Sequence, residues 1–203
     1  MKRMITRAAA GGKALLACAM LTFPGSVAVA DPVRYVIDPE HVSIGFLVDH
    51  IGYQKILGMF LKTEGEYIFD ADTKTMQNLR VTVDADSVFT NHSARDRHVR
   101  GGDFLDVSDH PEIVYKAERA EVTGDRTGKV FGELTLLGQT HPLVLDVVWN
   151  KTADYPFGHE LETMGVSARG VVKRSLYGMD YAVGNGLVGD DVELIIEMEA
   201  NAK

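Results

Sequence analysis

The chain has 203 residues, of which 29 are acidic and 21 are lysine or arginine, so its formal net charge is −8. The first thirty residues hold four of the basic residues and no acidic one, which leaves residues 31–203 with a charge of −12. This negative charge argues against nucleic acid and anionic membrane surfaces as partners, and is typical of a protein kept soluble by its surface.

Residues 1–30 have the pattern of a secretory signal peptide. A basic start is followed by a short apolar run over residues 14–23 and by the small-x-small sequence Ala28-Val29-Ala30. The apolar run is too short for a membrane span, so we expect export to the periplasm and cleavage after Ala30. Lipoprotein processing at Cys18, the only cysteine, is the weaker alternative because the Ala-Val-Ala site is better formed. Residues 31–203 are then expected to form one domain without disulfides.

The rest of the chain consists largely of stretches in which apolar and polar residues alternate, as in β-strands with one buried face. The alternation predicts strands around residues 42–48, 58–69, 79–83, 113–115, 130–136, 143–149, 166–172 and 192–198. In the second of these it places Met59, Leu61, Tyr67 and Phe69 on one face. Turn sequences separate the strands, which predicts an all-β sandwich or barrel, and the length of several strands favours a barrel.

Residues 87–111 interrupt this pattern with a long connection rich in charged residues. A connection of this length inside a compact domain usually forms a lid or a binding loop. Ser93 is expected to cap a short helix over residues 94–100, with Asp96 completing the cap and Gly101-Gly102 ending the helix. We therefore expect a helical lid across one end of the barrel.

Three charged residues of this connection suggest two different roles. Asp96 and His98 could act as an acid and base, with Arg95 holding an anion. However, residues two apart on a helix do not face each other, and no nucleophile motif accompanies them. The stronger hypothesis is structural, with Arg95 and Asp96 in buried ion pairs that anchor the lid. We therefore expect no catalytic residues.

Arg174 falls on the inward face of its predicted strand, where an unpaired cation is costly. Two interpretations are equally good. The guanidinium could hold the head group of a ligand at the barrel mouth, or it could pair with a lid carboxylate such as Asp96 or Asp103.

The seven histidines do not have the spacing of a metal site. None forms a His-x-x-x-His pair, and no cysteine accompanies them after residue 30, so we expect no bound metal. His50 continues the inward phase of Phe46 and Val48 and is the histidine that we expect to be enclosed.

Several motifs together resemble one family. They are Tyr35-x-Ile37-Asp38-Pro39-x-His41-x-Ser43, Phe46-x-Val48-x-His50-x-Gly52, Gly58-x-Phe60, Arg95-Asp96-x-His98-x-Arg100-x-x-Asp103-Phe104-x-Asp106, Gly132-x-Leu134-Thr135-Leu136-x-Gly138 and Arg174-Ser175-x-Tyr177-Gly178-Met179. The chain resembles the YceI-like proteins, exported lipocalin-like barrels that bind polyisoprenoids, over roughly residues 33–200. It departs from the family pattern at Gly101-Gly102, where a serine is common, and at Leu105, where a second phenylalanine is common.

The resemblance implies an antiparallel, lipocalin-like extended β-barrel with an apolar tunnel and no known catalytic residues. The expected function is periplasmic carriage or sequestration of an isoprenoid-chain or similar amphiphilic lipid, with no cofactor other than a bound isoprenoid or quinone-like molecule. The residues expected to contact the ligand are Phe46, His50, Phe60, Phe69, Phe104, Tyr115, Trp149, Arg174 and Met179. The residues expected to hold the lid are Arg95, Asp96, His98 and Asp103.

Two other functions stay open at this point. One is an enzyme acting on such a lipid through Asp96, His98 and Arg174. The other is a partner that holds quinone for a membrane redox protein, although the sequence carries no docking signal. A homodimer formed through a free strand edge is a further alternative, which closure of the barrel would disfavour.

Overall fold

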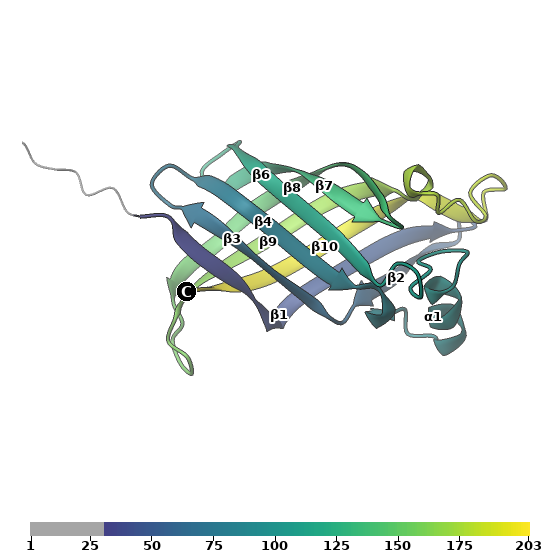
Figure 1. The fold of residues 1–203 in the computed structure, drawn as a ribbon, viewed down its shortest axis with the longest axis horizontal. Coiled ribbons are helices and arrows are strands. Elements are labelled where there is room, and N and C mark those ends of the chain that lie inside the picture. Colours follow the sequence, from purple (N-terminus) through teal and green to yellow (C-terminus); the bar gives the residue numbers. More distant parts are fainter. Residues whose placement is uncertain (1–30) are drawn as a thin grey trace, which may run out of the picture.

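The computed structural model describes residues 31–203, so the predicted signal peptide over residues 1–30 lies outside the described residues. The described chain is almost entirely β-strand, as predicted (Figure 1). Its strands are β1 (Val33–His50), β2 (Gln54–Phe60), β3 (Thr63–Asp70), β4 (Thr75–Asp84), β5 (Val88–Phe89), β6 (Glu112–Val122), β7 (Thr127–Leu136), β8 (Gln139–Asp154), β9 (Glu162–Lys173) and β10 (Val188–Ala202). Its helical segments are η1 (Ala85–Ser87), α1 (Ser93–Arg100) and η2 (Arg174–Tyr177).

The strands form one antiparallel sheet that closes into a barrel because β10, the last strand, also pairs with β1. Eight strands make the closed ring, in the order β1, β10, β9, β8, β7, β6, β4 and β3. Closure gives each strand of the ring pairing partners on both sides. The sheet keeps an edge outside the ring, where β2 pairs with β5 only at Met59 and Phe60. The predicted antiparallel, lipocalin-like extended barrel is confirmed.

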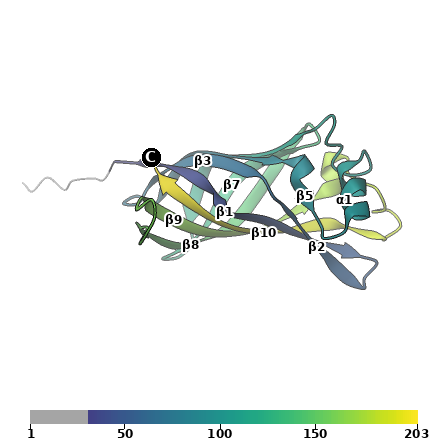
Figure 2. The ribbon, with the colours of Figure 1, turned by 90° about the horizontal axis from the view of Figure 1, so that it is seen from below.

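On the side opposite β10, strand β1 pairs with two different strands. Residues 33–36 pair with β3, whereas residues 44–50 pair with β2. The β1–β2 hairpin therefore leaves the barrel wall at one end, the same end at which α1 lies (Figure 2). The C-terminus lies at the other end (Figure 1).

The predicted alternation over residues 58–69 is wrong because a break separates β2 from β3. Tyr67 and Phe69 point into the barrel, but Leu61 is 62% exposed and Phe60 is the inward residue of β2. Residues 61 and 62 are not in a strand, so the alternation shifts by one residue across the break. One continuous strand was the wrong reading of this stretch.

The predicted helical lid in the 87–111 connection is confirmed, with a different N-terminal cap. Helix α1 starts at Ser93, and the capping residue is His92, whose Nδ1 atom accepts the backbone N–H of Arg95 at 3.3 Å. Gly101 ends the helix as predicted. No helix in residues 31–203 has the length and apolar character needed to cross a membrane.

Candidate ligand-binding site

The barrel encloses a cavity of about 320 Å³ whose lining is almost entirely apolar. Its walls are the inward side chains of the barrel strands, and Val99, Phe104 and Leu105 of the lid also line it. Among the described lining residues, Arg174 is the only charged one. An apolar cavity of this size suits an apolar ligand and disfavours ordered water, which needs two to four polar partners.

Most of the residues predicted to contact a ligand line this cavity. They are Phe46, Phe60, Phe69, Phe104, Tyr115, Trp149, Arg174 and Met179. Their contact with a ligand stays a prediction. His50 is the exception, because its side chain is exposed at the end of β1. The register of β1 against β10 shifts between Val48 and His50, which ends the inward alternation before His50.

Glycines in the wall make room for aromatic rings. A Cβ atom on Gly58 would lie 2.2 Å from the ring of Phe46, and one on Gly132 would lie 2.5 Å from the ring of Tyr115. The tips of these rings therefore occupy space that a side chain at either glycine would fill. Phe46 also contacts Phe60, with ring centroids 5.7 Å apart.

The tyrosine hydroxyls inside the barrel are already bound to protein atoms. Tyr115 donates toward the carbonyl oxygens of Val130 at 3.2 Å and Leu143 at 3.1 Å, and the Tyr67 hydroxyl contacts the sulfur of Met164 at 3.3 Å. Burial raises the pKa of both tyrosines, so both stay neutral. The cavity therefore offers a ligand apolar surface and few free hydrogen-bonding groups.

Arg174 is 2% exposed, and its guanidinium donates hydrogen bonds to backbone carbonyl oxygens. Nη1 donates to Met179 at 2.8 Å, Nη2 to Tyr181 at 2.9 Å and to Val188 at 3.1 Å, and Nε to Gly189 at 2.8 Å. Burial lowers the pKa of Arg174, but an arginine stays charged in proteins. Its role in the fold is to hold the loop between η2 and β10 against the barrel.

Of the two interpretations of Arg174, its pairing with a lid carboxylate is therefore wrong. In residues 31–203 no ion pair joins it to Asp96 or Asp103, because its donors are directed to the carbonyls of its own loop. It contacts the lid instead through Phe104, whose ring centroid lies 5.7 Å from the guanidinium carbon. The guanidinium also borders the cavity, so a polar ligand group could still approach it.

Thr90 connects Arg95 and Asp96, the two lid residues that were expected to form buried ion pairs anchoring the lid. Oδ1 of Asp96 accepts the backbone N–H of Thr90 at 2.7 Å and its hydroxyl at 2.5 Å. Arg95 donates from Nε to the same hydroxyl at 2.8 Å and from Nη2 to the Thr90 carbonyl at 2.6 Å. The predicted buried ion pairs of Arg95 and Asp96 are corrected to hydrogen bonds of both residues with Thr90, a residue that carries no charge and that sequence analysis missed.

His98 and Asp103 lie on the outer side of the lid. The Nε2 atom of His98 is 2.9 Å from Oδ2 of Asp103, and both side chains are about half exposed. The His98 ring also packs edge-on against Phe104 and Tyr181, with centroids 5.0 Å and 5.2 Å away. Asp96 is buried on Thr90 instead. Asp96 therefore shares no partner with His98 and Arg174, which both contact Phe104 and Tyr181. No hydrogen bond or ion pair within residues 31–203 joins the three residues of the alternative enzyme hypothesis to one another.

The hydrogen bonds of the Asp96 carboxylate allow a prediction of how low pH affects the stability of the protein. Hydrogen bonds from Thr90 hold the pKa of Asp96 below its usual range, against the opposing effect of burial. A lowered pKa stabilises the folded state above the unfolded pKa of about 3.9, and this stabilisation disappears as the pH falls through the folded value. Asp96→Asn keeps an acceptor for Thr90 but removes the titration. We expect wild type to have the higher melting temperature by a constant margin from about pH 8 to pH 5, and the margin to shrink below about pH 4.

Other carboxylates titrate in the same pH range. The quantity to follow is therefore the difference in melting temperature between wild type and Asp96→Asn at each pH. Thermal unfolding by circular dichroism at several pH values would supply it. A margin that is unchanged down to about pH 3 would show that folding does not alter the proton affinity of Asp96.

The chain matches the YceI-like domain family over residues 35–200. A UPF0312 protein of Pectobacterium atrosepticum is 34% identical over 185 residues, covering 91% of this chain and 93% of the relative. One from Pseudomonas savastanoi pv. phaseolicola is 37% identical over 148 residues, covering 72% and 77%.

Solved structures show the same barrel. A YceI protein of Campylobacter jejuni superposes with a TM-score of 0.69 at 28% identity, covering 76% of this chain and 90% of the other. A polyisoprenoid binding domain from Saccharophagus degradans has a TM-score of 0.64 at 13% identity, covering 84% and 99%, and at that identity shows likeness of fold alone. The sequence match, the closed antiparallel barrel and its enclosed apolar cavity agree, and the chain belongs to the YceI-like family.

Proposed function

We propose that the protein binds an isoprenoid chain, or a similar amphiphilic lipid, in the barrel cavity and carries or sequesters it in the periplasm. The observation that carries the proposal is the enclosed cavity of about 320 Å³ with one charged residue, Arg174, among its described lining residues. The polyisoprenoid binding domain of Saccharophagus degradans, which has the same fold, supports the choice of ligand class. The predicted leader over residues 1–30 supports export.

The energetics of such binding need no specific polar contact. Each buried methylene contributes about 0.8 kcal/mol, so one five-carbon isoprene unit contributes at most about 4 kcal/mol. Micromolar affinity requires about 8 kcal/mol. Two units supply at most about 8 kcal/mol, so three or more buried units are needed once the cost of ordering the chain is subtracted. Affinity should depend on chain length and only weakly on the head group.

The single tryptophan allows a direct test. Trp149 lines the cavity and packs edge-on against Phe69, with ring centroids 5.6 Å apart. We expect its fluorescence to change on titration with geranylgeraniol, which has four isoprene units, and geraniol, with two, to bind at least about a hundredfold more weakly. Native mass spectrometry should show one geranylgeraniol per chain.

Geranylgeranyl phosphate serves as the control for the head group and should bind within about tenfold of the alcohol. Equal affinity for geraniol and geranylgeraniol would contradict the proposal, because the affinity would then not depend on the length of the buried chain. No change in fluorescence and no complex by mass would also overturn it.

A further inference from the structure

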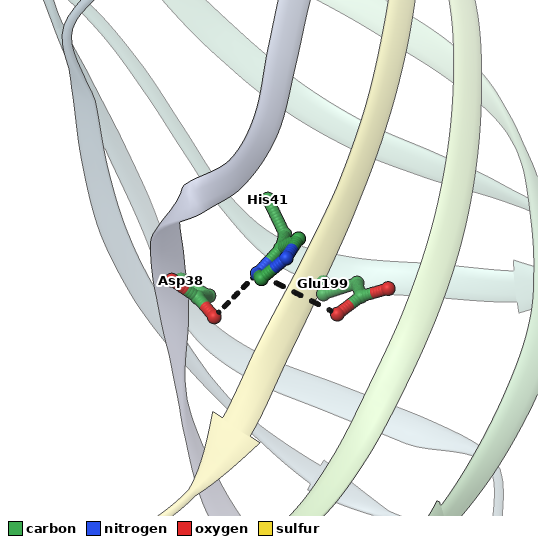
Figure 3. A group of neighbouring side chains, drawn as sticks. All are labelled: Asp38, His41 and Glu199. Atoms are coloured by element: carbon green, nitrogen blue, oxygen red, sulfur yellow. Dashed lines mark hydrogen bonds and ion pairs between the residues drawn. The ribbon is translucent and has the colours of Figure 1, made fainter. Parts of the chain in front are cut away.

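A second cluster of functional side chains lies on the outer surface of the barrel, away from the cavity lining. Strand β1 pairs Ile37 with Ala200 and Val42 with Met198 of β10, so the four residues 38–41 of β1 stand opposite the single residue Glu199. This bulge takes Asp38 and His41 out of the regular alternation and turns both side chains toward Glu199 (Figure 3). Within the bulge, the Glu40 N–H donates to Oδ1 of Asp38 at 2.9 Å.

The three side chains converge on a small volume. The Nδ1 atom of His41 is 2.9 Å from Oδ2 of Asp38 and 3.9 Å from Oε2 of Glu199. One ligand atom from each residue lies within 4.8 Å of the other two. Two ligands of a tetrahedral zinc ion, each about 2.0–2.1 Å from the metal, lie roughly 3.3 Å apart, so modest side-chain rotation would suffice.

The Glu199 side chain is 35% exposed, but one of its carboxylate oxygens lacks a hydrogen-bond donor. Its Oε2 atom is buried and, among the described residues, is the one buried side-chain oxygen or nitrogen without a hydrogen-bond partner. A buried carboxylate oxygen without a donor is costly and calls for a water or an ion. His41 does not supply the missing donor, because the Nδ1 atom that faces Glu199 makes its hydrogen bond with Asp38.

We propose that Asp38, His41 and Glu199 bind one divalent transition-metal ion, of which Zn²⁺ is the representative. One imidazole nitrogen and two carboxylate oxygens are ligands that Zn²⁺ accepts, and solvent supplies the remaining position. A hollow lined by His41, Glu199 and Tyr155 adjoins the cluster and gives the ion access from solvent. The ion would fasten the β1 bulge to β10, across the pair of strands that closes the barrel.

The test uses the untagged protein, freed of metal with EDTA and dialysed, and Zn²⁺ as the probe in isothermal titration calorimetry. We expect one ion per chain and a rise in melting temperature with Zn²⁺. Glu199→Gln and His41→Asn should each weaken binding at least about tenfold. Co²⁺ in place of Zn²⁺ should give visible absorption that His41→Asn alters, which identifies the nitrogen ligand.

The matched control is Glu193→Gln, which removes a carboxylate from the same strand where it pairs with Lys55 instead. This variant should bind Zn²⁺ as wild type does. Circular dichroism in EDTA should show that all variants keep the barrel. Equal binding by wild type and Glu199→Gln, or no binding by wild type, would overturn the proposal and leave water as the partner of Glu199. Neither result would bear on lipid binding, which Trp149 reports separately.

Discussion

Replacing Arg174 with methionine should lower the free energy of unfolding by about 3–5 kcal/mol, because several buried carbonyl oxygens would lose their hydrogen-bond donor. Methionine keeps much of the length of the side chain but has no donors. The carbonyls of Met179, Tyr181, Val188 and Gly189 would then lose the group that binds them. Each unsatisfied buried carbonyl costs about 1–3 kcal/mol, and movement of the loop toward water would recover part of the sum.

Arg169→Met is the matched control for this experiment. Arg169 lies on β9, only five residues before Arg174, but on the outer face, where its side chain is 51% exposed. It pairs with Glu197 and donates to the carbonyl oxygens of Ala168 and Ile196 at the surface, so it has contacts of the same kinds without burial. Exposed ion pairs contribute about 0–1 kcal/mol, so this control should change little. Urea unfolding at neutral pH measures both variants. Similar small losses for the two arginines would show that the carbonyl contacts of Arg174 do not stabilise the fold.

Arg174 also illustrates what sequence analysis can and cannot predict. Its inward position followed from alternation along β9, because a closed barrel requires each strand to keep one apolar face. The hydrogen-bonding partners of Arg174 could not be predicted from the sequence, because they are backbone carbonyls, which every residue has. A search for opposite charges therefore pointed to Asp96 and Asp103, whereas the structure uses the loop after η2. Thr90 was missed for the same reason, since a neutral residue gives no charge signal.

Irregularities in single strands account for the other differences. The fold class and most of the cavity lining were predictable because they depend on regular alternation, and the lid was predictable because a long connection interrupts that alternation. Leu61 and His50 were misplaced where that alternation is broken, at the β2–β3 break and at the register shift near the end of β1. The cluster of Asp38, His41 and Glu199 depends on another irregularity, the bulge in β1, and joins opposite ends of the described chain. A bulge changes which residues meet without leaving a periodic signal.

Filling the cavity should abolish most lipid binding without unfolding the barrel. Ala168 is 5% exposed and lies on β9 with its side chain toward the cavity, between its register partners Val147 and Ile196, which also line it. A phenylalanine at this position would occupy space that the proposed ligand needs. Displacing only two methylenes costs about 1.6 kcal/mol, which is more than a tenfold loss of affinity.

Val171→Phe separates this effect from a general effect of a larger side chain. Val171 is on the same strand but faces outward and is 52% exposed, so its ring would add bulk to the surface and leave the cavity unchanged. Calorimetric titration with geranylgeraniol should show at least tenfold weaker binding for Ala168→Phe and wild-type affinity for Val171→Phe. Melting temperatures should confirm that both variants are folded, since overpacking into an existing cavity costs less than the usual 1–3 kcal/mol or so. If Ala168→Phe is folded and binds as tightly as wild type, the lipid does not occupy the part of the cavity beside Ala168.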